Sequence, residues 1–548
     1  MFKPKLLDTL KNYNKAQFYK DVIAGIIVGI VALPLAIAFA IASGVSPEKG
    51  IFTAIIAGFV ISALGGSKVQ IGGPTGAFIV IVYGIVQQFG VNGLVIATFI
   101  AGILLVIMGF AKFGSVIKFI PHPLIVGFTT GIAVIIFSSQ MKDFLGLKMG
   151  NVPADFVNKW IAYYHNIFSL NIPALIIGSL TIALIIFWPK VTHKVPGSII
   201  AILLSTIVVY YFKIPVETIG SRFGAVPTSL PSPVIPAISW AVFKQLIKPA
   251  FTIALLGGIE SLLSAVVADG MIGGNHRSNT ELIAQGFANI CSSVFGGIPA
   301  TGAIARTATN IKNGGRTPVA GIVHAMVLFF ILLFVGKWAA LIPMATLGGI
   351  LIIVAYNMSE WKSFISIMKI SKNDAAVLIT TFLLTVLIDL TVAIEIGIIL
   401  AGFLFMRDMM KMSSVEHVDL RSSYTEDDFN NNPLPEGVDV FEINGPLFFG
   451  AAYKFKDAMK IIGEPAKVLI IRMKNVPVID ATGIHILADV NRDVSESGTK
   501  LILSEVNSEQ VLAELQKARL LFKIGKANVT DTFENALKRS IEILGVKK

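Results

Sequence analysis

Long runs of hydrophobic residues follow one another along most of the chain and predict helices that cross a membrane. A spanning helix needs about 20 mainly apolar residues. Such runs, some a little shorter, include Val22–Ala42, Gly93–Phe110, Leu124–Ser139, Leu175–Trp188, Ile199–Tyr211, Val319–Gly336 and Ala375–Ile388. We expect a transmembrane domain over 21–406 with about fourteen segments, about seven in 21–213 and about seven in 246–406. A proline-rich connector at 213–240 separates the two sets.

From about residue 407 the pattern changes to short strands that alternate with helices. The predicted strands are Val438–Ile443, Val468–Met473 and Lys500–Ser504, and the predicted helices are Ala452–Ile461, Ile484–Ser495, Glu509–Ala518 and Thr532–Ile543. This alternation is typical of a small α/β domain, which we place at 437–548. The acidic and proline-rich residues within 407–436 predict an exposed linker, marked by Glu426-Asp427-Asp428 and Pro433-Leu434-Pro435.

Composition supports a membrane protein and excludes several other classes. Hydrophobic residues make up 54% of the chain and the mean hydropathy is +0.76, which a soluble domain of ordinary size does not reach. The net charge of +11 does not indicate nucleic-acid binding, because lysines gather beside the membrane segments. Five of them precede the first segment, at positions 3, 5, 11, 15 and 20. This bias places the N-terminal segment 1–20 in the cytoplasm.

Further composition signals concern the C-terminus, disulfides and metals. An even number of segments returns the C-terminal domain to the cytoplasmic side, so both termini are expected there. The single cysteine, Cys291, excludes an internal disulfide and is interpreted as a packing residue. No group of residues has the spacing of metal ligands, so we predict no cofactor and no metal.

Two stretches of the chain repeat at one fixed offset. Ile41–Gly44 resembles Val267–Gly270, and Thr75–Phe78 resembles Thr301–Ile304, in both cases 226 positions later. An odd number of segments in each repeat gives the two copies opposite orientations. Inverted repeats with short Gly/Pro-broken segments are typical of transporters that bind their substrate between the repeats.

Both repeats place glycine and proline at the entry of a short helix, in 72–77 and in 296–303. Proline suits a first helical turn, and the free N–H groups that follow, with the positive end of the helix dipole, form an anion site without a charged side chain. If two such half-helices meet near the midplane of the membrane, their positive ends would attract an anion to the same point. The alternative is that both are ordinary kinks between segments.

Two charged residues are predicted to lie at membrane depth, where ionisable side chains are costly and usually functional. Arg306 follows the second half-helix entry and would add positive charge to the anion site. Glu260 lies opposite Pro34 at the repeat offset, among small residues, with Ser264 one turn later on the same face. We assign Glu260 and Ser264 to ion coupling, with Glu260 as the proton carrier. Alternatively, Glu260 and Arg306 form a fixed ion pair.

These motifs resemble the sulfate permease family of anion transporters over nearly the whole chain. The matching stretches are Ala32–Phe39, Gly73–Ala77, Glu260–Ser264 and Ala303–Thr307, and in the C-terminal domain Asn444–Gly450 and Val478–Gly483. The C-terminal stretches are similar to the STAS domain of that family.

The resemblance implies a seven-plus-seven inverted repeat that is divided into a core domain and a gate domain. It also implies a homodimer in the cell membrane with cytoplasmic STAS domains, and an elevator-like movement of the core. The substrate would lie between the third and tenth helices. The implied substrate-binding residues are Pro34, Phe39, Gly76, Ala77, Phe78, Gly302, Ala303, Ile304, Ala305 and Arg306.

Departures from the family pattern bear on the transported ions. Many sulfate-carrying members have a glutamine and a tyrosine where this chain has Leu35 and Phe39, so an amide is missing from the site. Sodium-coupled bicarbonate members have an aspartate at the position of Glu260, and the glutamate resembles proton-coupled members. In soluble STAS relatives a serine in this turn is phosphorylated. Here the turn holds Asp480 and Thr482, where Thr482 is either a regulatory site or, as we prefer, the N-cap of the next helix.

The sequence therefore favours a secondary active transporter of a small anion, coupled to protons, rather than an enzyme. An anion channel or uniporter, and a sodium-coupled bicarbonate or sulfate transporter, stay open. A nucleobase symporter is disfavoured by Arg306 and the STAS domain, and a receptor would not need paired half-helices. Sulfate, bicarbonate, dicarboxylates and chloride all satisfy the predicted site, and the lipid bilayer and a second copy are the expected partners.

Overall fold

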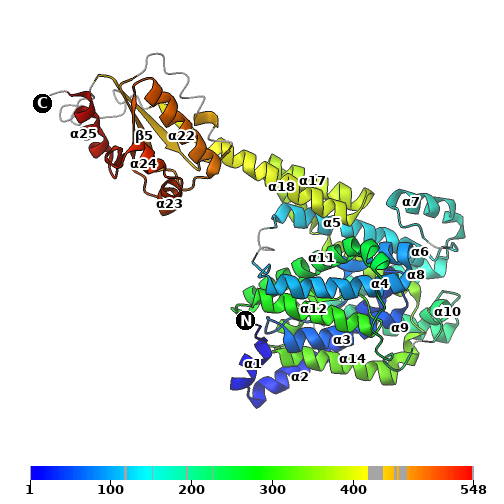
Figure 1. Ribbon diagram of the computed structural model, residues 1–548. Coiled ribbons are helices and arrows are strands. Elements are labelled where there is room, and N and C mark those ends of the chain that lie inside the picture. Colours follow the sequence, from blue (N-terminus) through cyan, green and yellow to red (C-terminus); the bar gives the residue numbers. More distant parts are fainter. Residues whose placement is uncertain are drawn as a thin grey trace. The chain divides into compact units, whose positions relative to one another are not determined.

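The computed structural model describes residues 2–115, 120–150, 152–192, 196–225, 227–417, 436–449, 453–455 and 466–545. The chain forms two compact units, Met1–Ala401 and Gly402–Lys548, which we call the membrane unit and the C-terminal unit (Figure 1). The domain boundaries drawn from the sequence, at 20, 406 and 436, stay a prediction.

The membrane unit is built almost entirely from helices. Its long helices are α2 (Lys15–Ala42), α3 (Pro47–Leu64), α4 (Ile79–Phe110), α5 (His122–Ser139), α8 (Ile172–Phe187), α9 (Gly197–Phe212), α11 (Trp240–Ile272), α12 (Ser278–Val294), α14 (Pro318–Ala339), α15 (Met344–Met358), α17 (Lys372–Leu387) and α18 (Leu390–Met412). The shorter ones are α1 (Lys5–Thr9), α6 (Met141–Leu145), α7 (Phe156–His165), α10 (Ile219–Phe223), α13 (Ile304–Lys312) and α16 (Trp361–Ile370). A bend at Gly90, with φ 70°, divides α4 into two parts.

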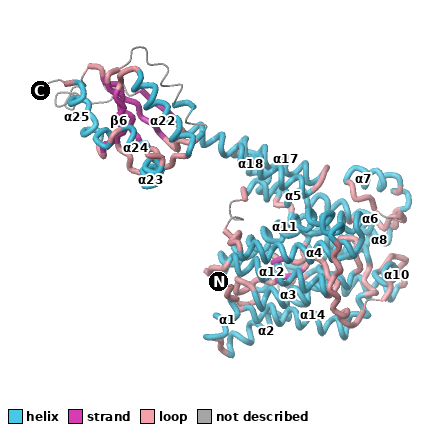
Figure 2. Tube along the Cα trace, in the orientation of Figure 1, coloured by secondary structure: helices cyan, strands magenta, loops and turns pink. Residues whose placement is uncertain are grey.

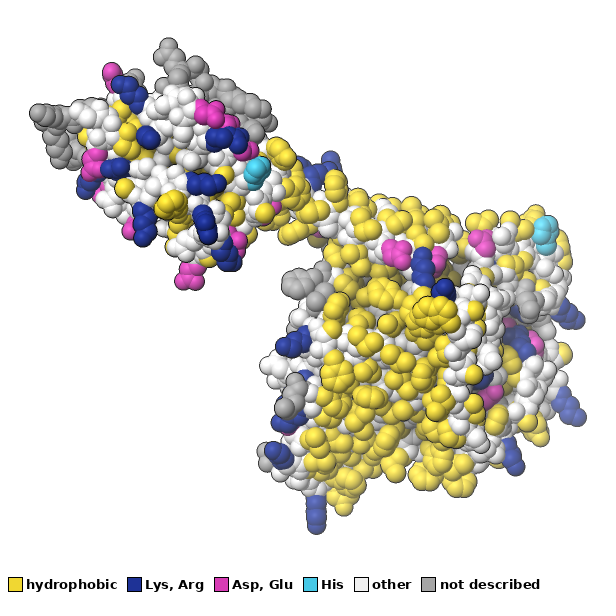
Figure 3. Space-filling view, in the orientation of Figure 1, with side chains coloured by type: hydrophobic (Ala, Val, Ile, Leu, Met, Phe, Trp, Pro, Cys, Tyr) yellow, Lys and Arg dark blue, Asp and Glu magenta, His cyan; other side chains and the backbone are white. Residues whose placement is uncertain are grey.

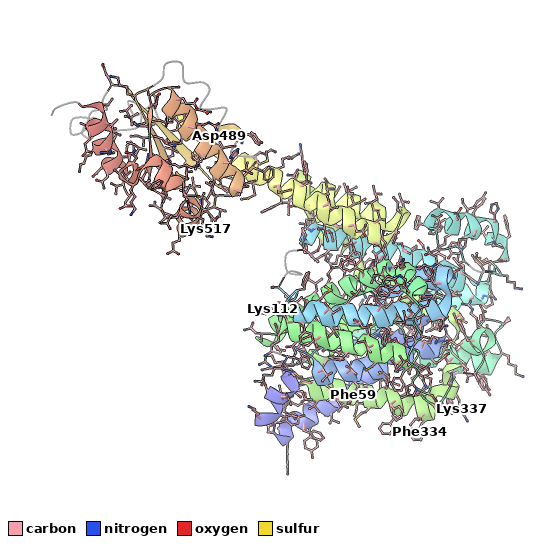
Figure 4. All side chains as sticks on the ribbon, viewed as in Figure 1. Phe59, Lys112, Phe334, Lys337, Asp489 and Lys517 are labelled. Carbon is pink, nitrogen blue, oxygen red and sulfur yellow. The ribbon has the colours of Figure 1, made fainter. Side chains whose placement is uncertain are left out.

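Among the described residues, eight helices are long and apolar enough to cross a bilayer by themselves. Hydrophobic side chains cover most of the face of the membrane unit shown in Figure 3. Phe59 of α3 and Phe334 of α14 are 47% and 75% exposed on this surface, while Lys112 and Lys337 lie at opposite ends of the unit (Figure 4). An apolar belt with charges at its two ends is what a lipid environment requires. The multi-pass helical membrane fold is confirmed, and the count of fourteen segments stays a prediction.

The helices of the membrane unit pack in two groups. The core group contains α2, α3, α4, α11, α12, α13 and α14, and the gate group contains α5, α8, α9, α15 and α17. Within the core group α12 lies directly on α4, because Gly102 and Gly286 face each other. A Cβ at Gly102 would lie 2.7 Å from the carbonyl oxygen of Gly286, and one at Gly286 would lie 2.6 Å from that of Gly102. Small residues of this kind let membrane helices approach closely.

Two short strands join the repeats at the centre of the membrane unit. Strand β1 (Gly72–Gly73) pairs antiparallel with β2 (Thr301–Gly302), so that Gly72 lies opposite Gly302 and Gly73 opposite Thr301. Figure 2 shows this pair surrounded by helices. Each strand leads into one half-helix, as the Gly/Pro entries predict: β1 into η2 (Gly76–Phe78) and α4, and β2 into α13.

The C-terminal unit contains one five-stranded sheet with the order β3-β4-β5-β6-β7. The strands are β3 (Ser414–His417), β4 (Val438–Asn444), β5 (Val468–Asn475), β6 (Lys500–Ser504) and β7 (Val529–Thr530). β3 is antiparallel to β4, and the remaining pairs are parallel. The helices are α22 (Ala481–Glu496), α23 (Glu509–Lys517), α24 (Leu520–Ile524) and α25 (Phe533–Leu544).

Alternation along the strands explains the two layers of helices. In β4, Phe441 and Ile443 point into a core shared with α22, α23 and α24, whereas Val440 points to the opposite face and packs with Phe533 of α25. The predicted strands and the three C-terminal helices are confirmed within one or a few residues. The predicted helix Ala452–Ile461 lies almost wholly outside the described residues.

The segment predicted as a linker, 407–436, is partly regular structure. The end of α18 and strand β3 lie within it. Sequence reasoning missed β3, β7 and α24 because they are too short to show a period. The stretches Glu426-Asp427-Asp428 and Pro433-Leu434-Pro435 lie outside the described residues.

Candidate anion site between the half-helices

Both half-helices begin without a side-chain cap. Thr75, which precedes η2, and Ala303, which precedes α13, accept no capping hydrogen bond. The hydroxyl of Thr75 is buried and has no hydrogen-bond partner among the described residues. The first N–H groups of such helices have no partner inside the helix and are stabilised by an anion. The local structure therefore fits the predicted anion site.

Gly76 marks the place where the core group meets the gate group. A Cβ at Gly76 would lie 2.8 Å from Sδ of Met358 and 3.5 Å from Cδ1 of Ile136 and Cε1 of Phe39. Met358 belongs to α15 and Ile136 to α5, so the gate group covers the first half-helix. Phe39, from α2 of the core group, completes an apolar wall.

The remaining predicted binding residues fall into two classes. Pro34, Ala77, Phe78, Gly302 and Ala303 are buried in the packed core group. The ring of Phe78 lies 3.4 Å from the position that a Cβ on Gly257 would take, so it packs against α11.

Ile304 and Ala305, in contrast, are exposed on the first turn of α13. The structure thus brings Phe39 and Gly76 together directly.

Arg306 is buried, with 2% of its surface exposed, and its Nη2 donates a hydrogen bond of 2.7 Å to the carbonyl of Pro74. Its Nη1 has no hydrogen-bond partner in the part of the chain that the structure describes. A Cβ on Gly73 would lie 2.3 Å from Nη1, which explains why this position of β1 is glycine. Arg306 therefore ties the second half-helix to the entry of the first and still carries free donors.

Glu260 lies in the middle of α11 and is half-buried. No ion pair joins it to Arg306, so the alternative of a fixed pair between them is absent from this structure. The charged group that acts on Glu260 is another acid, Glu360, between α15 and α16. Ser264 Oγ donates a hydrogen bond of 3.4 Å to Oγ1 of Thr307 in α13.

A buried polar network, which the sequence did not reveal, fixes the strand pair to α11. Ser261 Oγ lies 2.7 Å from Thr301 Oγ1, accepts a hydrogen bond from Gly302 N at 2.9 Å, and is fully buried. Thr301 Oγ1 also donates to the carbonyl of Gly257 at 2.9 Å. Gln70 Nε2 donates to the carbonyl of Ser261 at 3.2 Å. Polar residues at positions 261 and 264 of an apolar helix were the available signal.

The polar network continues along α13. Thr307 accepts a hydrogen bond of 3.0 Å from Ile71 N, and Asn310 donates one of 2.9 Å to the carbonyl of Val69. These bonds connect the segment before β1 to the second half-helix. The two half-helices are therefore held as one rigid block by backbone and side chains together.

Comparison with known proteins agrees with this arrangement. The model of the sulfate permease family matches residues 18–381, and the model of the STAS domain matches residues 431–536. The chain belongs to the sulfate permease family. It is 42% identical to "Putative sulfate transporter YvdB" of Bacillus subtilis (strain 168), over 95% of this chain and 97% of that protein. It is 30% identical to the bicarbonate transporter BicA of Picosynechococcus sp., over 96% of each chain.

Solved structures show the same fold. The murine anion transporter Slc26a9 in its inward-facing state matches with a TM-score of 0.88 and 19% identity, over 99% of this chain and 94% of that one. The transmembrane domain of the cyanobacterial bicarbonate transporter BicA matches with a TM-score of 0.63 and 28% identity, over 71% of this chain and 98% of that one.

In this member of the sulfate permease family a cavity of about 890 Å³ opens at the end of the membrane unit that carries α7 and α10, opposite the N-terminus (Figure 1). It lies between the core and gate groups. None of the predicted site residues lines it, but Ile79, directly after Phe78, does. The place where the N-termini of η2 and α13 meet, which we call the half-helix crossing, remains our candidate site. The uncapped N–H groups and Arg306 are there and not in the cavity.

In the STAS domain the turn at Asp480 differs from expectation. The N-cap of α22 is Asp480 and not Thr482: its Oδ1 accepts a hydrogen bond of 2.8 Å from Gly483 N, and its Oδ2 accepts one of 3.1 Å from Phe449 N. Thr482 is the second residue of α22 and is half-buried. The helix begins earlier than its apolar pattern indicated, because Ala481 and Thr482 carry no hydrophobic period.

Proposed function

We propose that the chain is a secondary active transporter of a small anion, which binds between the N-termini of η2 and α13. The observation that carries this proposal is the pairing of two uncapped half-helices by β1 and β2, with Arg306 buried beside them. Membership of the sulfate permease family supports it, as do relatives that are named sulfate and bicarbonate transporters.

A monovalent oxyanion such as bicarbonate is the substrate that the site favours. The side chains nearest to Gly76 are apolar, and the buried guanidinium of Arg306 already donates one hydrogen bond to the carbonyl of Pro74. A dianion such as sulfate would lose a large hydration energy on entering this site. One arginine and two helix N-termini do not supply enough stabilisation to compensate for that loss. The absence of the amide that sulfate-type members carry at Leu35 agrees with this choice.

We propose that Glu260 couples transport to a proton. It is half-buried at membrane depth and has no basic partner in the described part of the chain, so a proton or another cation is free to bind it. Glu360 is on the gate side, so movement of the core relative to the gate changes the field that acts on Glu260. This supports alternating access of the elevator type, with the core group as the moving part.

The experiment is uptake of labelled bicarbonate and sulfate into proteoliposomes, with a proton gradient, a sodium gradient or neither. We expect accumulation of bicarbonate that a proton gradient drives and that Glu260→Gln abolishes. Glu395→Gln is the matched control, because Glu395 is a half-exposed carboxylate of α18 far from the crossing in sequence. If only a sodium gradient drives accumulation, the coupling ion is sodium and not a proton. If anion flux is rapid and independent of both gradients, the protein is a channel or uniporter and not a secondary active transporter.

Assembly and orientation follow from the same reasoning. We propose that both termini lie in the cytoplasm, since lysines gather before α2, and that the protein is a homodimer in the cell membrane. The STAS domain would then contribute to the contact between copies or to regulation. Cross-linking in native membranes and protease protection of the two termini test these points.

A further inference from the structure

One basic side chain in the wall of the cavity between core and gate is buried and has no ion-pair partner among the described residues. Lys159 of α7 is 3% exposed and lines the cavity. Within the described residues it takes part in no ion pair and no side-chain hydrogen bond. A buried ammonium group is rarely left unpaired, because desolvation of a charge is expensive. The structure thus presents a cation that faces a cavity large enough for an ion.

The other charged groups around the cavity are already engaged or are acidic. Arg222 of α10 donates a hydrogen bond of 2.6 Å to Asp143 and also pairs with Glu217. Lys142 donates to the carbonyl of Gly150 at 2.9 Å. The remaining charged and titratable residues that line it are Tyr83, Asp155, Lys248 and Asp389.

Asp155, one turn before Lys159, is occupied in another way. Its Oδ1 accepts the hydrogen bond of 2.8 Å from Asn158 N that caps α7. Lys248 has a distant partner in Glu395, at 3.8 Å. Among the basic side chains of the described cavity wall, Lys159 is therefore the one that has neither an ion pair nor a side-chain hydrogen bond.

The helix that carries Lys159 is fixed in place. Trp160 Nε1 donates a hydrogen bond of 3.2 Å to Ser138 Oγ of α5, and the ring of Trp160 contacts that of Tyr163 edge to face. Tyr163 packs with Met141 and Leu147 in a small apolar cluster. These contacts hold the ammonium group at the cavity wall and not in open solvent.

We propose that this cavity contains a second anion site, in which Lys159 binds a small oxyanion such as bicarbonate or sulfate on its path to the half-helix crossing. Gln87 and Gln88 of α4 line the same cavity and supply amide donors. Ile79 lines this cavity and directly follows Phe78, the last residue of η2, so the cavity wall reaches the residue next to the first half-helix. This inference rests on the proposed anion transport, and it adds a capture step before the transport site.

The first test is transport by the full-length protein in proteoliposomes, measured against bicarbonate or sulfate concentration. Loss of one charge-assisted hydrogen bond lowers kcat/KM about tenfold, while kcat is unchanged. We expect this of Lys159→Met, which keeps the length of the side chain, and near wild-type values from Lys159→Arg. Lys148→Met is the matched control, because Lys148 is exposed in the loop before α7 and lies outside the cavity wall.

The pH dependence gives a readout that a merely structural role would not change. Burial lowers the pKa of Lys159 to about 8, and the neighbouring Asp155 offsets part of this effect. The ammonium is charged below that pH and neutral above it. We therefore expect kcat/KM of the wild type to fall more steeply than that of Lys159→Arg as pH rises from 7 to 9, because arginine keeps its charge, whereas the effect of the coupled proton is common to both proteins. Identical profiles of both proteins would overturn the proposal.

A second test does not need transport. A lysine of lowered pKa reacts with amine reagents, and the labelling of Lys159 in the full-length protein is read by peptide mass spectrometry. Sulfate and bicarbonate are expected to protect Lys159 in the wild type and in Arg306→Ala, whereas Lys148 stays unprotected. Protection that disappears in Arg306→Ala would assign the effect to the half-helix site and refute a second one. If neither anion is transported, the proposed function fails, while this labelling still decides the second site.

Discussion

Replacement of Ser261 by alanine tests whether the polar network holds the half-helices in place. Ser261→Ala removes the acceptor of Gly302 N and the donor to Thr301 Oγ1. Thr301 keeps the carbonyl of Gly257, so the main loss is one buried N–H without a partner. Such a group costs about 1–3 kcal/mol, and hydrogen bonds between membrane helices contribute at most about 1.7 kcal/mol. We expect a loss of about 1–2 kcal/mol, concentrated at the strand pair.

Hydrogen exchange measured by mass spectrometry suits this local effect. Exchange through local opening of the peptide around Gly302 should become roughly tenfold faster, because about 1.4 kcal/mol corresponds to a factor of ten. Ser293→Ala is the matched control: Ser293 is also buried, but its hydroxyl bonds only to the carbonyl of Ile290 in its own helix. Equal exchange at Gly302 in both variants would refute a structural role for the network.

Three further changes test other parts of the site. Gly302→Ala should strongly reduce the yield of folded protein in size-exclusion chromatography, because its Cβ would lie 1.5 Å from Nε2 of Gln70. The double variant Gly302→Ala with Gln70→Ala should recover part of that yield. Arg306→Ala should weaken bicarbonate binding roughly tenfold or more, with the loss of a charge-assisted interaction, whereas unchanged affinity in a binding titration would leave Arg306 structural. Asp480→Ala should destabilise α22 by about 1 kcal/mol, visible as faster exchange at its first turn in the full chain, and Thr482→Ala should change it little.

The helices and the half-helix entries could be predicted because their signals are local. Apolar runs fix helices such as α5 and α14 within a few residues, whereas α2 begins at Lys15, well before its apolar run, and the offset of 226 positions aligns the two Gly/Pro entries. The bend at Gly90 has a weaker signal, since one glycine in an apolar run is also compatible with an unbroken helix. The strands of the C-terminal unit that are longer than four residues were predictable from their alternation or continuous apolar run.

The contacts that position the site were not predictable, because their partners are distant in the sequence. Arg306 was expected to face an anion or Glu260, yet its Nη2 donates to the backbone carbonyl of Pro74. Every residue has such a carbonyl, so the sequence carries no signal for this contact. Gln70 and Ser261 are 191 positions apart and meet only after the two repeats have packed. Glu360 carries no motif at all, and only the fold shows that its charge acts on Glu260.

The strand pair also joins two segments that the ribosome makes at different times. Gly72 finds its partner in Gly302, about 230 residues later in the chain. At the usual pace of roughly 5–20 residues per second, the ribosome needs on the order of 10–50 seconds to supply that partner. Throughout this interval the entry strand before the first half-helix has no strand to pair with. The backbone groups of Gly72 and Gly73 therefore gain their strand partners only after the second repeat has been made.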